Sequence, residues 1–316
     1  MAGCASGSTS PAGDPATIGD PPLTPVAATV PPRKPRHPAT SAPLRIGVVA
    51  NVAGYGAPRQ QLVLRLGLKL IREDRGDYAV SWAHAHHINC IGLIYLNPNS
   101  PGTGCDEIEL DNEPYWQGVD PRLWAQQADA VAKALRSRGI TKPILLPLLA
   151  FASNKAFGAA GFDGDGNYTY QGVTKPWVEW VNEGAPDIWQ YVDGFAIHPY
   201  TGGTAPSYQS MNTVRSELDA IPAAKGKPFW ITEVGWPTGP SSDSWATTEA
   251  NQAAWLGQFI DAMKARTDVA AVVVYDLVDG TPAPYQSNLN AYGLLRVDGS
   301  PKPSLAVVKD AIAAAR

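Results

Sequence analysis

The strongest constraint on the fold is an alternation of segment types that starts near Leu44 and runs to the carboxyl terminus. Short runs of apolar, often β-branched residues alternate with longer amphipathic stretches, which is typical of parallel strands joined by helices. Eight such runs occur, at 45–50, 68–72, 90–96, 107–110, 143–149, 194–198, 228–233 and 269–277. Eight strand–helix units in roughly 270 residues predict an α/β fold, a single (β/α)8 TIM barrel that spans residues 44–316.

One connection in this pattern is too short for a complete unit. Residues 97–106 are mostly Asn, Pro, Ser and Gly, and a parallel crossover through a helix usually needs a dozen or more residues. Elsewhere the helix signals are clear, because Asp120 and Pro121 supply an N-cap and a first-turn proline for a helix that should end near Arg138. We therefore expect the helix between strands 3 and 4 to be shortened or missing.

Residues 1–43 form a compositionally separate segment. They are rich in Pro, Ala, Ser and Thr and show almost no apolar periodicity, so they are predicted to be a disordered tether. Met1-Ala2-Gly3-Cys4 resembles the end of a bacterial lipoprotein signal. That resemblance implies a lipid on Cys4, a membrane tether, and an extracellular or cell-surface location. An unmodified cysteine in a plain linker is the alternative.

Charge and hydropathy exclude several kinds of partner. The formal net charge is −4, so no basic field favours nucleic acid, and no run of about 20 apolar residues predicts a membrane-spanning helix. The histidines at 84–87 lack acidic or cysteine partners at a suitable spacing for a metal. The stretch 163–167 fails as a calcium loop because Tyr168 and Thr174 stand where a glycine and a bidentate carboxylate are needed. We expect a monomer with no metal and no cofactor.

Two cysteines lie next to the short connection. Cys90 opens the third predicted strand and Cys105 comes just before the fourth. Neighbouring strands lie about 5 Å apart, which is within reach of a disulfide. A Cys90–Cys105 disulfide would close the loop that lacks a helix, and two free buried thiols are the alternative. We favour the disulfide because it suits an exported protein.

Two glutamates stand at the carboxyl ends of predicted strands. Glu113 lies just past the fourth strand and Glu233 ends the seventh. A buried carboxylate is costly unless it is paired or used, and catalytic groups of a barrel sit at the carboxyl ends of its strands. Strands four and seven lie on opposite sides of the barrel mouth, so the two carboxylates can face each other, as glycoside hydrolysis requires. A separation of about 5 Å would indicate retention of configuration, and about 6.5–9.5 Å inversion.

The sequence around these glutamates resembles glycoside hydrolase clan A. The resemblance is carried by Asn112-Glu113-Pro114 after strand four, and by Thr232-Glu233 with Gly235-Trp236 after strand seven. The carboxyl-terminal motifs are similar to those of bacterial family 39 and family 5 relatives: Tyr275-Asp276-Leu277, Tyr292-Gly293-Leu294-Leu295 and Lys302-Pro303. The resemblance implies a retaining O-glycoside hydrolase that cleaves a β-linked poly- or oligosaccharide by double displacement. Glu113 would be its acid/base and Glu233 its nucleophile.

The resemblance also implies roles for four neighbours of the glutamates. Asn112 matches the residue that hydrogen-bonds the sugar 2-hydroxyl, and Arg72 matches an arginine that supports the nucleophile. His198 and Tyr200 match a His/Tyr position near the nucleophile. A structural ion pair at the barrel rim is the alternative for Arg72, and a core histidine is the alternative for His198.

Three aromatic residues are further candidates for substrate binding. Trp116 and Trp236 lie just beyond the glutamates and could stack on sugar rings, whereas Tyr275 stands where many clan members have Trp. Each of the three could instead be ordinary core. A catalytically inactive carbohydrate-binding surface protein on the same barrel is the second functional hypothesis, and the presence of both glutamates argues against it.

Overall fold

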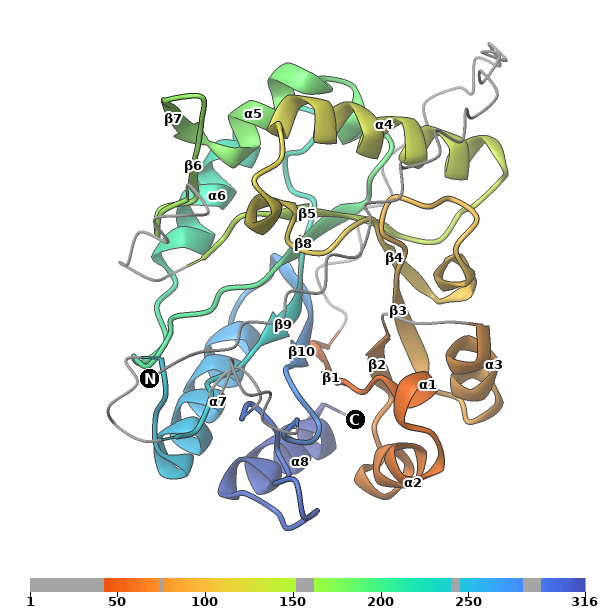
Figure 1. Ribbon diagram of the computed structural model, residues 1–316, viewed down its shortest axis with the longest axis vertical. Helices are drawn as coiled ribbons and strands as arrows, with labels where there is room; N and C mark the ends of the chain where they lie inside the picture. Colours follow the sequence, from red (N-terminus) through yellow and green to blue (C-terminus); the bar gives the residue numbers. More distant parts are fainter. Residues whose placement is uncertain (1–42, 74–76, 152–161, 240–244, 281–290, 316) are drawn as a thin grey trace, which may run out of the picture. The chain divides into compact units, whose positions relative to one another are not determined.

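Eight short apolar segments pair in parallel and close into a barrel in the computed structural model (Figure 1). They are β1 Arg45–Val49, β2 Leu70–Glu73, β3 Asn89–Leu93, β4 Glu107–Glu109, β5 Ile144–Leu148, β8 Gly194–Ile197, β9 Phe229–Val234 and β10 Val269–Val274. Their order is β1-β10-β9-β8-β5-β4-β3-β2, and pairing between β1 and β10 closes the ring. The predicted single (β/α)8 barrel is confirmed, and each predicted strand is present.

The structure describes residues 43–73, 77–151, 162–239, 245–280 and 291–315, which belong to one unit, Pro31–Arg316. All but the last residue of the predicted tether at 1–43 lies outside the described residues, and Cys4 with it. The tether and the lipid on Cys4 therefore stay predictions.

Helices surround the barrel and follow the signals in the sequence. They are α1 Val52–Tyr55, α2 Ala57–Leu66, α3 Asp77–Ala85, α4 Pro121–Ser137, α5 Trp177–Gly184, α6 Gln209–Asp219, α7 Glu249–Lys264 and α8 Pro303–Ala314. The Asp120 side chain caps α4 by accepting from the backbone N–H of Arg122 and Leu123. Among the described residues, no helix combines the length and the apolarity that crossing a bilayer demands.

The connection between β3 and β4 contains only a 3-10 turn, η1 Pro101–Gly104, so the expected loss of a helix there is confirmed. Gly92 and Gly102 allow this turn to lie directly on β3, because a Cβ on Gly92 would come within 2.2 Å of the Gly102 carbonyl oxygen. Cys90 and Cys105 form a disulfide at the base of this loop, with Cα atoms 5.0 Å apart.

The barrel interior changes from apolar to polar along the strands. Alternate residues of a strand face the same side, so the interior is filled by every second residue. Its middle is an apolar cluster of Val49, Leu70, Ile91, Leu145, Ala196, Trp230, Ala271 and Val273. Arg72 stands two positions after Leu70 and Glu109 two positions after Glu107, and both are buried. Buried charge therefore takes over from apolar side chains as β2 and β4 reach the barrel mouth.

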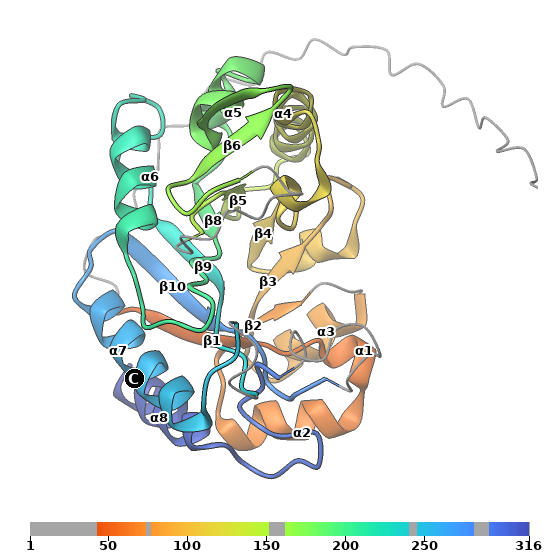
Figure 2. The same cartoon turned by 60° about the vertical axis from the view of Figure 1, so that its left-hand side comes forward.

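A β-hairpin interrupts the regular alternation after β5. Strands β6 Asn167–Tyr170 and β7 Val173–Pro176 pair antiparallel, and Figure 2 shows them beside α5. The Trp180 indole of α5 donates to the Tyr168 carbonyl at 2.9 Å, which fastens the hairpin to the helix. Asp163 accepts from the backbone N–H groups of Asp165 and Asn167, so the stretch once compared with a calcium loop forms the turn that leads into the hairpin.

Candidate active site

The two sequence-predicted glutamates converge at the barrel mouth. Glu233 lies in β9, and Glu113 stands between β4 and the 3-10 turn η2 Pro114–Gln117. One carboxylate oxygen of each glutamate and one imidazole nitrogen of His198 lie within 4.8 Å of one another. Glu113 has φ 45° and ψ 55°, a left-handed backbone that non-glycine residues rarely adopt. That geometry turns its side chain from the end of β4 toward His198.

Arg72 joins three groups at the end of β2. Its Nη1 donates to Glu233 Oε1 at 2.6 Å, its Nε to Glu109 Oε2 at 2.5 Å and its Nη2 to Asn112 Oδ1 at 2.8 Å. Burial of the guanidinium opposes its charge, but Glu109 and Glu233 outweigh that effect and hold the pKa of Arg72 above its usual range. A permanent cation therefore orients Glu233 and the Asn112 amide together.

Tyr200 occupies the second oxygen of Glu233. Its hydroxyl donates to Glu233 Oε2 at 2.7 Å, and burial together with the nearby Glu233 raises the pKa of Tyr200 well above the usual range. Tyr200 therefore stays a neutral donor. With Arg72 on one oxygen and Tyr200 on the other, Glu233 accepts at both oxygens, as a carboxylate does.

His198 contacts the other glutamate. Its Nδ1 lies 2.9 Å from Glu113 Oε1, and its Nε2 lies 3.0 Å from the Thr232 hydroxyl. Burial alone would lower the pKa of His198, but Glu233, Glu109 and Glu113 together raise it to about 10. His198 is therefore a buried side chain of the site, placed between the residue expected to carry the proton and the residue expected to attack.

Glu109 is a site residue that the sequence analysis missed. It is fully buried, and it accepts from Arg72 Nε at 2.5 Å and from the Thr232 hydroxyl at 2.9 Å. Burial opposes its ionisation, yet the Arg72 guanidinium and His198 outweigh that penalty and lower the pKa of Glu109 to about 2. The available signal was its position in a strand, in the same parity as Glu107, where an apolar residue is usual.

Asn112 presents its amide nitrogen to the mouth. Its Oδ1 is taken by Arg72 Nη2, which leaves the NH₂ group as the donor that can reach a sugar hydroxyl. The neighbouring Asp111 points away from the mouth and accepts from the Trp124 indole of α4 at 2.8 Å.

Trp116 and Tyr275 line the mouth as expected of substrate-binding residues. Trp116 is 40% exposed, and its ring meets the Phe162 ring edge to face at a centroid distance of 4.7 Å. Tyr275 is half-buried, and its ring centroid lies 5.3 Å from that of Tyr292 and 6.5 Å from that of Tyr200. Both residues keep an accessible part, so the expectation that they bind substrate stays open to test.

The expectation for Trp236 is wrong. Trp236 is 0% exposed, and its indole N–H donates to the Thr201 hydroxyl at 2.8 Å. Its ring packs against Trp255 and Phe259 of α7, at centroid distances of 6.0 and 6.2 Å. A ring that is covered on all sides cannot stack on a sugar, so Trp236 is a core residue beneath the site.

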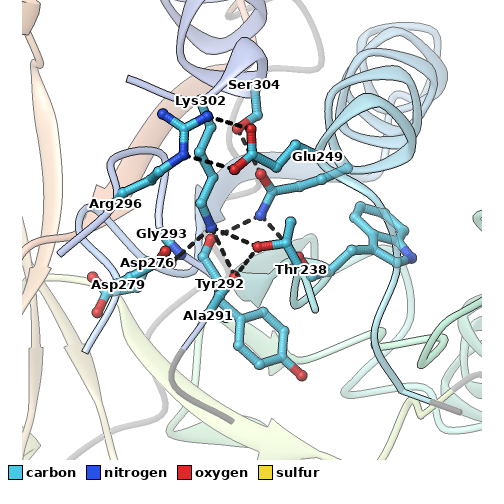
Figure 3. Close-up of polar contacts among 12 residues, drawn as sticks. Thr238, Glu249, Asp276, Asp279, Ala291, Tyr292, Gly293, Arg296, Lys302 and Ser304 are labelled. Atoms are coloured by element: carbon cyan, nitrogen blue, oxygen red, sulfur yellow. Dashed lines mark hydrogen bonds and ion pairs between the residues drawn. The ribbon is translucent and has the colours of Figure 1, made fainter. Parts of the chain in front are cut away.

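Lys302 ties together the loops that follow β9 and β10, as Figure 3 shows. Its buried ammonium donates to the Thr238 hydroxyl at 2.9 Å, to Asp279 at 2.8 Å and to the Ala291 carbonyl at 3.0 Å. Ala291 precedes Tyr292, whose ring centroid lies 5.7 Å from that of Tyr200. The motif that resembled family 39 and family 5 relatives at the carboxyl terminus thus supports the aromatic wall of the site from behind.

Two groups of side chains come close enough to be tested as metal sites. In the first, His84 and Asp106 lie near Cys90, but Cys90 is in a disulfide and offers no thiolate. In the second, formed by the two glutamates and His198, both Glu233 oxygens are already bound by Arg72 and Tyr200. A guanidinium at that distance would repel a cation, so these donors fit a carboxylate pair better than a metal.

Comparisons with known proteins agree with this geometry. No family model matches the chain. It is 30% identical over 121 residues to a probable glucan endo-1,3-beta-glucosidase of Aspergillus clavatus, which covers 36% of this chain and 26% of that protein. Its structure resembles that of a family 39 glycoside hydrolase of Bacteroides cellulosilyticus WH2, with TM-score 0.56, 19% identity and coverage of 86% of this chain and 64% of the other. It also resembles a beta-glucosidase of Exiguobacterium marinum, with TM-score 0.55, 12% identity and coverage of 81% and 86%.

The resemblance to the barrels of glycoside hydrolases is therefore confirmed at the level of the fold. The chain spans about a quarter of the length of the curated relative and less than two thirds of the family 39 structure, so their activities are statements about those proteins.

Proposed function

We propose that this protein is a retaining O-glycoside hydrolase that cleaves a β-linked poly- or oligosaccharide. The observation that carries the proposal is the approach of Glu113 and Glu233, whose nearest ligand oxygens lie within 4.8 Å at the ends of β4 and β9. Retaining enzymes hold their carboxyl groups about 5–5.5 Å apart, whereas inverting enzymes need about 6.5–9.5 Å to admit a water. The short distance supports retention.

The contacts of the two glutamates support separate roles in a double displacement. In the first step, Glu233 forms a bond to the anomeric carbon while the glycosidic C–O bond breaks, and Glu113 gives a proton to the leaving oxygen. In the second step, a water oxygen bonds to the anomeric carbon, its proton goes to Glu113, and Glu233 leaves as a carboxylate. One water is consumed, and both glutamates return to their starting states.

Digestion of a glycan panel tests the proposal. The local match to a probable glucan endo-1,3-beta-glucosidase makes β-1,3-glucan the first substrate to try. We expect the wild type to release sugars from at least one β-glycan, Glu233→Ala to release none, and NMR of the first product to show the β-anomer. An α-anomer would refute retention.

The second candidate, an inactive carbohydrate-binding surface protein, makes a different prediction. If the wild type and Glu233→Ala bind the same glycan equally and neither cleaves any, the hydrolase proposal fails. Arg72 and Tyr200 both serve Glu233, and a protein that only binds sugar has no need of an oriented nucleophile.

We also propose that the protein works outside the cell, tethered through residues 1–43 and a lipid on Cys4. The composition of this segment and the Cys90–Cys105 disulfide support that location. Mass spectrometry of the amino-terminal peptide from the native host tests it, because an unmodified Cys4 would rule out the lipid.

A further inference from the structure

We infer that Glu113 and His198 hold the catalytic proton jointly, and that Thr232 and Glu109 are positioning residues that decide which nitrogen of His198 is protonated. The inference rests on the proposed hydrolase function. It follows from a continuous chain of contacts that runs from Glu109 through Thr232 and His198 to Glu113.

Glu109 fixes the direction of the first hydrogen bond. Arg72 keeps it ionised, so its oxygens can only accept. The Thr232 hydroxyl, 2.9 Å from Glu109 Oε1, must therefore donate to it. A hydroxyl has one proton, so Thr232 accepts from its other neighbour, His198 Nε2, at 3.0 Å. His198 Nε2 consequently carries a proton.

The opposite nitrogen of His198 shares a single proton with Glu113. Nδ1 and Glu113 Oε1 lie 2.9 Å apart, a hydrogen-bond distance that needs one proton between them. Protonated Glu113 can donate to neutral His198, or the His198 cation can donate to the Glu113 carboxylate. Both arrangements contain the same number of protons, so the two residues titrate as a pair and their proton has a shared pKa.

The surroundings of His198 favour keeping this proton. From β4 and the residues after it come Glu109, whose Oε1 lies 3.7 Å from Nε2, and Glu113. From β9 comes Glu233, whose Oε2 lies 3.8 Å from Nδ1, and from its own loop comes the neutral Tyr200 ring. Arg72 is the nearby cation, and it is bound to Glu109 and Glu233. Three acidic groups around one imidazole stabilise its protonated form.

This arrangement makes the pair, rather than Glu113 alone, the acid and base of the reaction. In the first step Glu113 passes the shared proton to the leaving oxygen, and the pair is left as a carboxylate beside neutral His198. In the second step the pair regains one proton from the attacking water. Thr232 holds Nε2–H throughout, so His198 returns to the same tautomer in each cycle.

Thr232→Val tests the inference, because it removes the acceptor of Nε2–H and keeps the shape of the side chain. With that nitrogen unpaired, the pair should release its proton at lower pH. We expect the alkaline limb of kcat/KM against pH, measured on a substrate with a poor leaving group, to move down by about one pH unit. Thr232→Ser keeps a hydroxyl and should restore the wild-type limb.

Thr247→Val is the matched control. Thr247 is also buried, but its hydroxyl accepts from the Asn251 amide at the start of α7, so its loss should leave the alkaline limb in place. If the Thr232→Val and wild-type limbs coincide while the wild type is active, the inference is overturned and the hydrolase proposal stands. If the wild type cleaves no glycan, the hydrolase proposal is the one that fails.

A measurement on the wild type avoids any dependence on the folding of the variant. Nitrogen-15 NMR distinguishes protonated from unprotonated imidazole nitrogens. We expect Nε2 of His198 to be protonated from pH 5 to pH 8, and an unprotonated Nε2 in this range would overturn the inference.

Discussion

At the scale of single residues, the two glutamates differ in what surrounds them. Arg72 and Tyr200 both donate to Glu233, whereas Glu113 meets His198, with which it can exchange a proton. Two carboxylates with the same chemistry thus receive different partners, and different partners are what separate a nucleophile from an acid.

We predict that Glu113→Ala slows substrates with poor leaving groups by about 10²–10⁴-fold, because only they need a proton on the departing oxygen. Activated aryl glycosides should lose much less in the first step. A series of aryl glycosides with graded leaving groups, followed by burst kinetics, measures this. Glu233→Ala is the control and should lose both classes of substrate. Equal losses for Glu113→Ala across the series would contradict its role as the acid.

The two tryptophans near the glutamates should respond differently to truncation. Trp116→Ala should raise KM by about 3- to 10-fold and change the melting temperature little, since Trp116 is 40% exposed at the mouth. Trp236→Ala should lower the free energy of unfolding by about 3–5 kcal/mol, because it empties a fully buried site. Glycan titrations and urea unfolding of both variants measure the two effects. A large loss of stability in Trp116→Ala would show that its ring serves packing instead.

The residue-scale expectations succeeded or failed according to burial. Arg72, Asn112, His198 and Tyr200 meet around the glutamates because each stands at a strand end, which sequence patterns can locate. Trp236 also follows a strand end, but α7 covers it, and the sequence contains no statement of which helix will lie over which loop. Glu109 was missed because its only signal was the parity of a three-residue strand.

At the scale of elements, the missing helix between β3 and β4 is balanced by other links. The η1 turn lies on β3, and the Cys90–Cys105 disulfide joins the start of β3 to the residues before β4. Lys142 adds a hydrogen bond at 2.5 Å to the Gly104 carbonyl. A loop without a helix therefore stays attached to the barrel wall.

Removing this disulfide should lower stability through the unfolded chain. We predict that Cys90→Ala with Cys105→Ala lowers the free energy of unfolding by about 3 kcal/mol, because the bond closes a loop with a sequence separation of 15. Urea unfolding of the double variant measures this, and the reduced wild type is the control. Alkylation of both thiols in denatured, unreduced protein would show that no bond forms.

The hairpin β6–β7 is the element that the sequence analysis did not predict. Its strands have only four residues each, and most of those residues are exposed or half-buried. Such a segment lacks the apolar run by which the eight barrel strands were recognised. Its pairing depends on α5, where Trp180 holds the Tyr168 carbonyl, and that contact exists only in the folded chain.

At the scale of the whole molecule, stability depends on pH through groups far from the mouth. Glu217 of α6 is half-buried, and burial, with Glu179 of α5, raises its pKa from 4.5 to about 7. One of its oxygens has no hydrogen-bond partner among the described residues. A raised acid stabilises the fold below its unfolded pKa, and that contribution is lost as pH rises through about 7.

We predict that Glu217→Gln raises the melting temperature at pH 8 by about 1–3 °C, because glutamine resembles the neutral acid. At pH 4 the variant and the wild type should melt together. Thermal unfolding at both pH values measures this, with Glu183→Gln of α5 as an exposed control that should change neither value. A gain of equal size at pH 4 would mean that charge at Glu217 is not the cause.

By itself, the sequence determined the barrel, its eight strands, the shortened third connection and the two strand-end glutamates, because each depends on local periodicity or on a position along a strand. Only the tertiary structure decided that Trp236 is core, that Glu109 belongs to the site and that His198 bridges Glu113 and Thr232. These outcomes depend on contacts between residues far apart in the chain. Such contacts are set by how the barrel closes and how its loops pack, which no local pattern records.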